Sequence, residues 1–154
     1  MGFRKNRFSV IMRHLLLLLV PLLTGCYFPK DPEDSLQKAR ERGLEVGIVH
    51  HPPFTVYENG KTSGTEVEIL EDFAKKEGLK INYTYGTETT LVKQLEEYRL
   101  HLIIGGFEKN TVWKDKAGLT TRYNDKNCMF IAKGENALLY RLESHLLKHR
   151  KNGS

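Results

Sequence analysis

The sequence predicts an α/β fold: a three-layer sandwich in which a central, mostly parallel sheet carries helices on both faces. Short apolar runs of strand length alternate along the chain with longer segments whose apolar residues recur every three or four positions. This order of strand, helix, strand, helix and strand is typical of parallel strands joined by right-handed helical crossovers. The run 102–104 is apolar at every position, as in a strand that helices cover on both sides.

The chain opens on a basic segment that is followed by a strongly apolar one. Four basic residues precede the nine-residue apolar stretch 15–23, and Thr24-Gly25 then leads into Cys26. This order of charge, apolar residues and small residues is that of a secretory signal peptide. The stretch is shorter than the roughly 20 apolar residues that a membrane-spanning helix needs. Translation from Met1 or from Met12 would leave a complete leader in either case.

The cysteine that follows the small pair resembles the lipobox of bacterial lipoproteins. The resemblance implies that the leader 1–25 is removed and that Cys26 becomes a lipidated first residue, on a membrane surface that faces the periplasm or the exterior. Tyr27 follows it in place of Asp, which favours the outer membrane in a host with two membranes. An ordinary signal peptide or an uncleaved anchor, with Cys26 incidental, stays open as an alternative.

Removal of the leader changes the charge balance of the remaining chain. The leader holds four of the 24 Lys and Arg residues and none of the 19 Asp and Glu, so 20 basic and 19 acidic residues remain. The net charge falls from +5 to +1, and the basicity therefore gives no indication of a nucleic-acid partner. With Cys26 lipidated, Cys128 is a lone thiol in an apolar run, where we expect a buried small hydrophobe and no intrachain disulfide.

The elements of the domain follow in order. After the tether 26–34, we expect a helix over 35–42, a strand over 44–49, an extended segment over 54–57 with a turn at Asn59-Gly60, a helix over 65–77, a strand over 79–85, a helix over 89–98, a strand over 102–104, a helical turn over 110–116, a strand over 126–132, a helix over 136–148 and a frayed tail over 149–154. Residues 35–148 thus form a single domain.

Side-chain spacing justifies the longer elements. The helix 65–77 carries apolar residues at i, i+3, i+6 and i+7 and stops at Gly78. The strand 79–85 alternates apolar and polar positions, and the helix 136–148 turns five leucines to one side. Glu66 and Glu68 fall in the first turn of their helix, where carboxylates favour the helix dipole.

Four segments in this order resemble a known family. They are the strand and Pro-Phe loop 46–54, the helix start 64–68 behind an Asn-Gly-Lys turn, the strand run 102–107 and the segment 118–123. Together they resemble the first lobe of the family 3 extracellular solute-binding proteins, which are the amino-acid-binding components of ABC importers. The resemblance implies one lobe of a type II periplasmic-binding-protein fold.

The second lobe of that family is not evident in this sequence. After 118–123 the chain passes directly to 128–134 and a Leu-rich helix, which resemble the family's returning strand and C-terminal helix. Hinge closure around a ligand requires two rigid bodies. We therefore expect a lobe that binds weakly on an open face, or one whose other wall comes from a second copy or another protein.

The resemblance also implies where a ligand would bind, at the carboxyl ends of the strands. The expected ligand-binding residues are His51 and Phe54 after the first strand, Gly105, Gly106, Phe107 and Glu108 after the third, and Thr111 and Trp113 in the next turn. Trp113 stands where the family has a carboxylate-clamping Arg, and Glu108 stands where it has a small hydroxyl residue, so standard amino-acid binding is not expected. Backbone N–H groups at Gly106 and its neighbours would remain available to a ligand.

Two interpretations of the aromatic residues stay open. Side chains such as Trp113 and Phe107, with Glu108, would form a pocket for a cationic or polyamine-like solute. Alternatively, Trp113 and Phe107 fill the space that a second lobe would cover.

Two classes of function follow. The first is a membrane-anchored module that binds a small polar or cationic, amino-acid-like solute and acts with an ABC permease or a sensor. The second is a lobe that recruits or regulates a membrane or envelope partner without transport. Lobes of this family also occur fused to lytic transglycosylase domains, and we do not expect such a domain within these 154 residues.

No enzyme activity and no cofactor are expected. The chain has no nucleophile elbow, P-loop or dinucleotide motif. His50 and His51 with Glu66, Glu68 or Glu108 are the candidates for a metal site. Adjacent strand residues point to opposite faces, so we expect no metal there.

Overall fold

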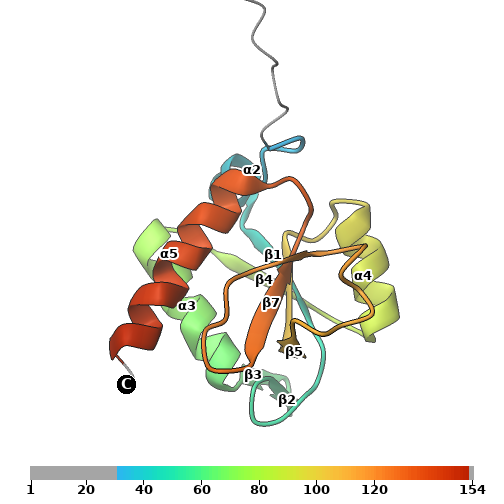
Figure 1. The fold of residues 1–154 in the computed structure, drawn as a ribbon, viewed down its shortest axis with the longest axis vertical. Coiled ribbons are helices and arrows are strands. Elements are labelled where there is room, and N and C mark those ends of the chain that lie inside the picture. Colours follow the sequence, from blue (N-terminus) through green and yellow to red (C-terminus); the bar gives the residue numbers. More distant parts are fainter. Residues whose placement is uncertain (1–30, 153–154) are drawn as a thin grey trace, which may run out of the picture.

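The computed structural model describes residues 31–152; the leader and Cys26, for which lipidation is expected, lie outside the described residues. It shows a central sheet between two layers of helices (Figure 1). The predicted three-layer α/β sandwich is confirmed, and its sheet has five strands in the order β4-β1-β5-β7-β6.

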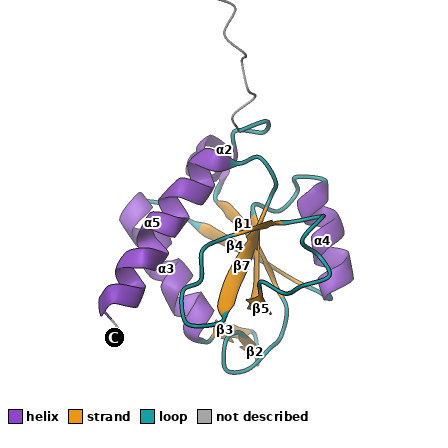
Figure 2. Cartoon of the chain, viewed as in Figure 1, coloured by secondary structure: helices purple, strands orange, loops and turns teal. Residues whose placement is uncertain are grey.

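Figure 2 shows how helices and strands alternate along the chain. In order, the elements are α2 (Ser35–Arg42), β1 (Leu44–Ile48), β2 (Val56–Glu58), β3 (Lys61–Ser63), α3 (Thr65–Glu77), β4 (Ile81–Tyr85), α4 (Glu88–Glu96), β5 (Leu102–Glu108), β6 (Gly118–Leu119), β7 (Asn127–Ile131) and α5 (Asn136–Asn152). Within this described part of the chain, no helix combines the length and the apolar character that a membrane span requires.

The sheet is parallel on one side and antiparallel on the other. β1 pairs in parallel with both β4 and β5, while β7 runs antiparallel to β5 and β6 antiparallel to β7. The carboxyl ends of β4, β1 and β5 therefore meet at one edge of the sheet. The separate hairpin β2–β3 lies at that edge (Figure 1).

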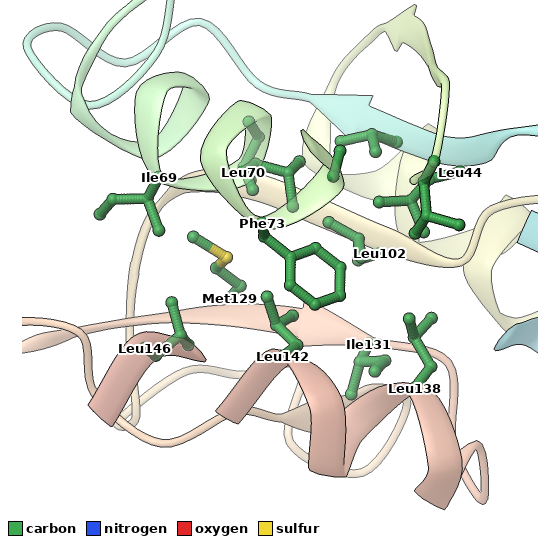
Figure 3. Packing of buried hydrophobic residues seen from close by; sticks show 14 of the residues in the cluster. Leu44, Ile69, Leu70, Phe73, Leu102, Met129, Ile131, Leu138, Leu142 and Leu146 are labelled. Atoms are coloured by element: carbon green, nitrogen blue, oxygen red, sulfur yellow. The ribbon is translucent and has the colours of Figure 1, made fainter. Parts of the chain in front are cut away.

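Each face of the sheet has its own apolar core. The helices α2, α3 and α5 cover one face, and α4 covers the other. In the larger core, Phe73 of α3 points between Met129 of β7 and Leu142 of α5 (Figure 3). In the smaller core, α4 packs against Ile103 and Phe130. Successive residues of β5 alternate between these cores, as the pleat of a strand requires.

The structure differs from the sequence prediction in several places, among them the short strands β3 and β6, which were not predicted. The strand β5 continues past residue 104 to Glu108, because its last residues pair with β7 through Phe107 and Cys128. The segment 110–116 contains a single hydrogen-bonded turn, in which the N–H groups of Lys116 and Ala117 donate to the carbonyl of Trp113, and it is too short to form a helix. The helix α5 continues four residues past its predicted end at 148, and its last turns lie against the rest of the lobe at a cavity wall.

Part of the predicted tether is bound to the domain. The N–H of Asp31 donates to the carbonyl of Gly134 at 3.2 Å, and its carboxylate accepts from the N–H of Ala137 at 2.6 Å. The buried carboxylate of Glu135 accepts from the N–H groups of Glu33 at 2.9 Å and Ser35 at 2.8 Å. Residues 31–35 are therefore fixed to the junction between β7 and α5.

Candidate functional site

Four of the predicted site residues meet at the carboxyl edge of the sheet. The Nδ1 of His51 lies 2.6 Å from the carbonyl oxygen of Gly105, and because a carbonyl only accepts, this nitrogen donates. The rings of His51 and Phe54 meet edge to face with 5.3 Å between centroids. Gly106 lies against both rings, since a Cβ there would stand 2.3 Å from Phe54 Cδ2 and 2.9 Å from His51 Nδ1.

A buried carboxylate, Glu66, holds the turn of backbone at this edge. Its Oε2 accepts hydrogen bonds from the N–H groups of Gly105 at 2.7 Å and Gly106 at 2.8 Å. Gly106 has a φ of +68°, and the register between β5 and β7 shifts between Ile103 and Phe107. This irregularity lets two successive N–H groups converge on one oxygen, in the manner of an anion-binding nest.

The two N–H groups are therefore not available to a ligand. The expectation that Gly106 and its neighbours present free N–H groups is wrong for the N–H of Gly105 and of Gly106, because the chain supplies its own carboxylate. Sequence analysis assigned Glu66 to the helix dipole and missed this partner. The spacing of Glu66 with Ile69, Leu70 and Phe73 places it on the buried face of α3. A carboxylate on a buried face requires a hydrogen-bond donor near it, and this signal could have indicated the contact.

Glu66 and Tyr123 form a buried titratable pair. Burial raises the pKa of Glu66, against the opposing effects of the Gly106 N–H, the Tyr123 hydroxyl and the Gly105 N–H. Burial also raises the pKa of Tyr123, and the Glu66 carboxylate adds to that rise. The Tyr123 hydroxyl and the Glu66 carboxylate thus act on each other, in a buried position behind the cavity that Tyr123 lines.

A cavity of about 410 Å³ lies beside this edge. The Pro-Phe loop, the start of α3, the loop before β7 and the end of α5 form its walls, with Pro53, Phe54, Thr65, Ile69, Tyr123, Asn124, Asp125, His149 and Arg150 as lining residues. The volume is that of a small-ligand pocket. The walls combine two aromatic rings with groups of both charges. Sequence analysis missed the contributions of Tyr123 and Asp125, and it treated the end of α5 as a tail.

The other four predicted site residues do not join this group. Phe107 turns into the smaller core, where it stacks on Phe130 with 3.9 Å between ring centroids. Glu108 is exposed at the end of β5, and the Oγ1 of Thr111 accepts from the N–H of Trp113 at 3.3 Å. Since neighbouring strand residues face opposite sides, Phe107 and Gly106 point to different faces of the sheet.

Trp113 is held on the α4 side of the lobe. Its Nε1–H donates to the Oε2 of Glu88 at 2.9 Å, and its ring packs against the smaller core. The residues predicted to share one site are therefore separated, because Phe107 and Trp113 pack on the α4 side of the sheet and not at the carboxyl edge. Glu88, the partner of Trp113, is a further residue that sequence analysis did not single out.

The described residues contain no cluster of three or more His, Cys, Asp or Glu side chains that could hold a metal ion. His51 is bound to Gly105, and the Nδ1 of His50 accepts from the N–H of Tyr57 at 3.3 Å. Cys128 is buried, as predicted, and burial raises the pKa of its thiol to about 11. A thiol with this pKa stays protonated at neutral pH, which disfavours nucleophilic chemistry at Cys128.

Comparison of sequences relates the chain to one protein family and to one group of enzymes. Residues 44–153 match the bacterial extracellular solute-binding proteins, family 3. The membrane-bound lytic murein transglycosylase F of two strains of Vibrio cholerae serotype O1 is 39% identical over 66 residues in each case. The match covers 42% of this chain and 12% of the length of these relatives.

Comparison of structures finds similar folds among domains and proteins that bind amino acids. The arginine-bound form of domain 1 from TmArgBP has a TM-score of 0.66 and 24% identity, over 72% of this chain and 97% of that domain. A mutant of the same domain has a TM-score of 0.69 and 24% identity, over 75% of this chain and 98% of the domain. An ancestral cationic amino acid solute-binding protein has a TM-score of 0.69 at 13% identity, over 77% and 94% of the two chains.

These likenesses show a shared fold, that of one lobe of a type II periplasmic binding protein. The family match covers most of the chain and includes β1, α3, β5 and the Glu66 carboxylate that holds the edge of the sheet. The resemblance inferred from the sequence is confirmed, and the chain belongs to the bacterial extracellular solute-binding proteins of family 3.

Proposed function

We propose that this chain is an exported single-lobe binding module for a small, cationic, amino-acid-like solute. The observation that carries the proposal is the cavity of about 410 Å³ at the carboxyl edge of the parallel strands. In open α/β sheets, ligands bind outside the carboxyl ends of the strands. Phe54, which lies against His51 and Gly106 at this edge, lines the cavity, and Asp125 stands on another of its walls.

The lining of the cavity suits a cation that also carries a carboxylate. The rings of Phe54 and Tyr123 offer faces for cation–π contact, and Asp125 offers a negative charge to an ammonium or guanidinium group. Arg150 lines the same cavity and brings a positive charge to it, which favours a ligand that also carries a carboxylate.

A single lobe is sufficient for such binding in a protein of the same fold. Domain 1 of TmArgBP, which this chain covers almost completely, has been crystallised in its arginine-bound form. This supports a lone lobe as a receptor and supports arginine as the first solute to test. Because Trp113 replaces the family's clamping Arg and is bound to Glu88, the proposed ligand sits in the cavity and not at the 105–113 loop.

The proposed orientation of the lobe exposes the cavity to a partner. Residues 31–35 lie beside α2, at the end of the lobe opposite the hairpin β2–β3 and the carboxyl edge (Figure 1). A lipid on Cys26 would hold the end of the lobe that carries residues 31–35 at a membrane. The cavity would then face away from that membrane anchor, toward a permease, a sensor or a second copy of the lobe.

Isothermal titration calorimetry on the processed protein tests the solute-binding proposal. Titration with L-arginine, L-lysine and putrescine should give saturable binding, and L-glutamate should give none. Asp125→Asn should weaken arginine binding about tenfold, as expected for one charge-assisted contact. The matched variant Asp115→Asn, in the exposed turn before β6, should leave it unchanged. Absence of heat with every cationic solute, in a folded protein, would overturn the proposal.

The match to a lytic murein transglycosylase favours a second candidate, a lobe that regulates an envelope partner without transport. Cross-linking in intact cells separates the two. A solute-responsive receptor should bind arginine in isolation, whereas a regulatory lobe should give no solute response and a specific cross-link to an envelope protein through the same carboxyl edge.

A further inference from the structure

A second cavity lies on the outer face of the lobe, between α3 and α5. Its volume is about 510 Å³, and its lining residues are Phe73, Lys76, Glu77, Tyr140, Arg141, Ser144, His145 and Lys148. None of these residues lines the cavity at the carboxyl edge. The two helices run side by side over the larger core, and Phe73 of α3 and Leu142 of α5 pack into that core between them (Figure 3).

The walls of this groove carry an excess of positive charge. Lys76 pairs with Asp72 at 2.6 Å, and Arg141 lies 3.8 Å from Glu77, too far for a hydrogen bond. Lys148 forms no ion pair within residues 31–152. Lys148 therefore has no counter-ion in this part of the chain, and Arg141 has only a distant one. An anion could bind between these two cations.

One nitrogen of a buried imidazole at the same groove lacks a hydrogen-bond partner, although the ring also interacts with the backbone of Ile69. His145 is 7% exposed, and its Nε2 accepts and donates no hydrogen bond within the described part of the chain. The carboxylate of Asp72 stands 3.6 Å away, beyond hydrogen-bond distance, and the ring lies against Phe73 with 5.7 Å between centroids. A polar atom left unsatisfied in a buried position costs stability unless a ligand or water satisfies it. His145 lines the groove, so an anion bound there would stand close to its ring and favour its protonated form.

We infer that the groove between α3 and α5 is a binding site for a phosphate group, held by Lys148, Arg141 and His145. A tetrahedral oxyanion accepts from several cations at once, whereas a lone carboxylate is served best by one planar Arg fork. The hydroxyl of Ser144 lines the same groove and offers a further donor. The inference is independent of the solute-binding proposal, because the two cavities share no residue.

Protonation of His145 gives the site a distinctive signature. His145 faces Asp72 and Lys76 on α3 and has His149 nearby on α5. Burial, Lys76 and His149 lower its pKa, while Asp72 and a hydrogen bond to the backbone of Ile69 raise it. An anion in the groove favours the imidazolium. Binding should therefore take up a proton, and the affinity should rise as the pH falls from about 8 to about 6.

Calorimetry with glycerophosphoglycerol, a soluble phosphodiester of constant charge over this pH range, tests the inference on the processed protein. Measurements in two buffers of different ionisation enthalpy should reveal proton uptake. Lys148→Gln should weaken binding about tenfold, and His145→Gln should abolish the proton uptake. The matched variant Lys151→Gln, on the same helix and outside the groove, should bind like the wild type.

Competition distinguishes a lipid headgroup from a free phosphate. Vesicles of phosphatidylglycerol should displace the soluble phosphodiester if the groove reaches a membrane surface, and vesicles of phosphatidylcholine should not; if neither displaces it, the site serves a soluble phosphate. Absence of phosphodiester binding to folded protein would overturn the inference. Equal losses in Lys148→Gln and Lys151→Gln would do the same, because they would indicate a diffuse charge effect.

Discussion

The carboxylate of Glu66 accepts a hydrogen bond from the N–H of Gly106 across 40 residues of sequence. The contact joins the first turn of α3 to the end of β5, and it places Gly106 against His51 and Phe54 at the carboxyl edge. The site edge is therefore built on a buried carboxylate that no solvent reaches. Its energetic role can be measured directly.

Replacement of Glu66 by Ala should destabilise the lobe by about 3 kcal/mol, because it leaves two buried N–H groups without an acceptor. Glu66→Gln keeps a carbonyl oxygen and should cost less. Urea denaturation measures both. Glu68→Ala, on the exposed side of the same helix, is the control; a loss in Glu66→Ala no larger than this control would contradict a structural role for the carboxylate.

The stability of the lobe should depend on pH through Glu66. Its pKa in the folded state is raised above the ordinary value of 4.5, so the folded state binds this proton more tightly than the unfolded state does. The free energy of unfolding should therefore fall as the pH rises from about 4.5 through the raised pKa. Glu66→Gln should lack this decline. Parallel pH curves for the two proteins would show that Glu66 is not the titrating group.

Substitution of Gly106 by Ala should destabilise the lobe by about 3 kcal/mol, since it adds a steric clash with Phe54 to the cost of a positive φ. Gly60 separates these two contributions. It has a φ of +75°, but no atom lies within 4 Å of the position that an added methyl group would take, so Gly60→Ala should cost about 1 kcal/mol. Thermal unfolding of both variants measures the difference, and equal losses would argue against close packing at the carboxyl edge.

The fluorescence of Trp113 should respond to the loss of Glu88 and not to the binding of solute. Glu88→Ala removes the acceptor of the indole N–H and should shift the emission of Trp113, the single tryptophan of the chain. Trp113→Phe should keep the affinity for arginine within about twofold, because the ring packs against the α4 side. A large loss of affinity in Trp113→Phe would return Trp113 to the binding site.

Release of the N-terminal segment should follow from Glu135→Ala. The variant leaves the N–H groups of Glu33 and Ser35 without their acceptor and should cost about 2 kcal/mol. Limited proteolysis should then cut near residue 33 faster than in the wild type. Unchanged cleavage would indicate that Asp31 and its contacts with Gly134 and Ala137 suffice to hold the segment.

The sequence predicted the helices over 35–42 and 65–77 with their observed bounds. In both, a local signal decides the end: Gly43 and Gly78 have positive φ values and donate back to carbonyls of the last turn. The end of β5 was not predicted, because it depends on pairing with β7. The extension of α5 depends likewise on residues that pack against it from distant parts of the chain.

The candidate site also combines features that the sequence predicts with features that depend on tertiary contacts. By itself, the sequence determined the fold class, the parallel core strands and the meeting of His51, Phe54 and Gly106, because periodicity and strand order bring the carboxyl ends of parallel strands to one edge. Only the tertiary structure decided that Glu66 occupies the N–H groups of that edge and that Trp113 binds Glu88. The partner of a buried polar group is set by contacts between residues far apart in sequence, and no local pattern specifies them.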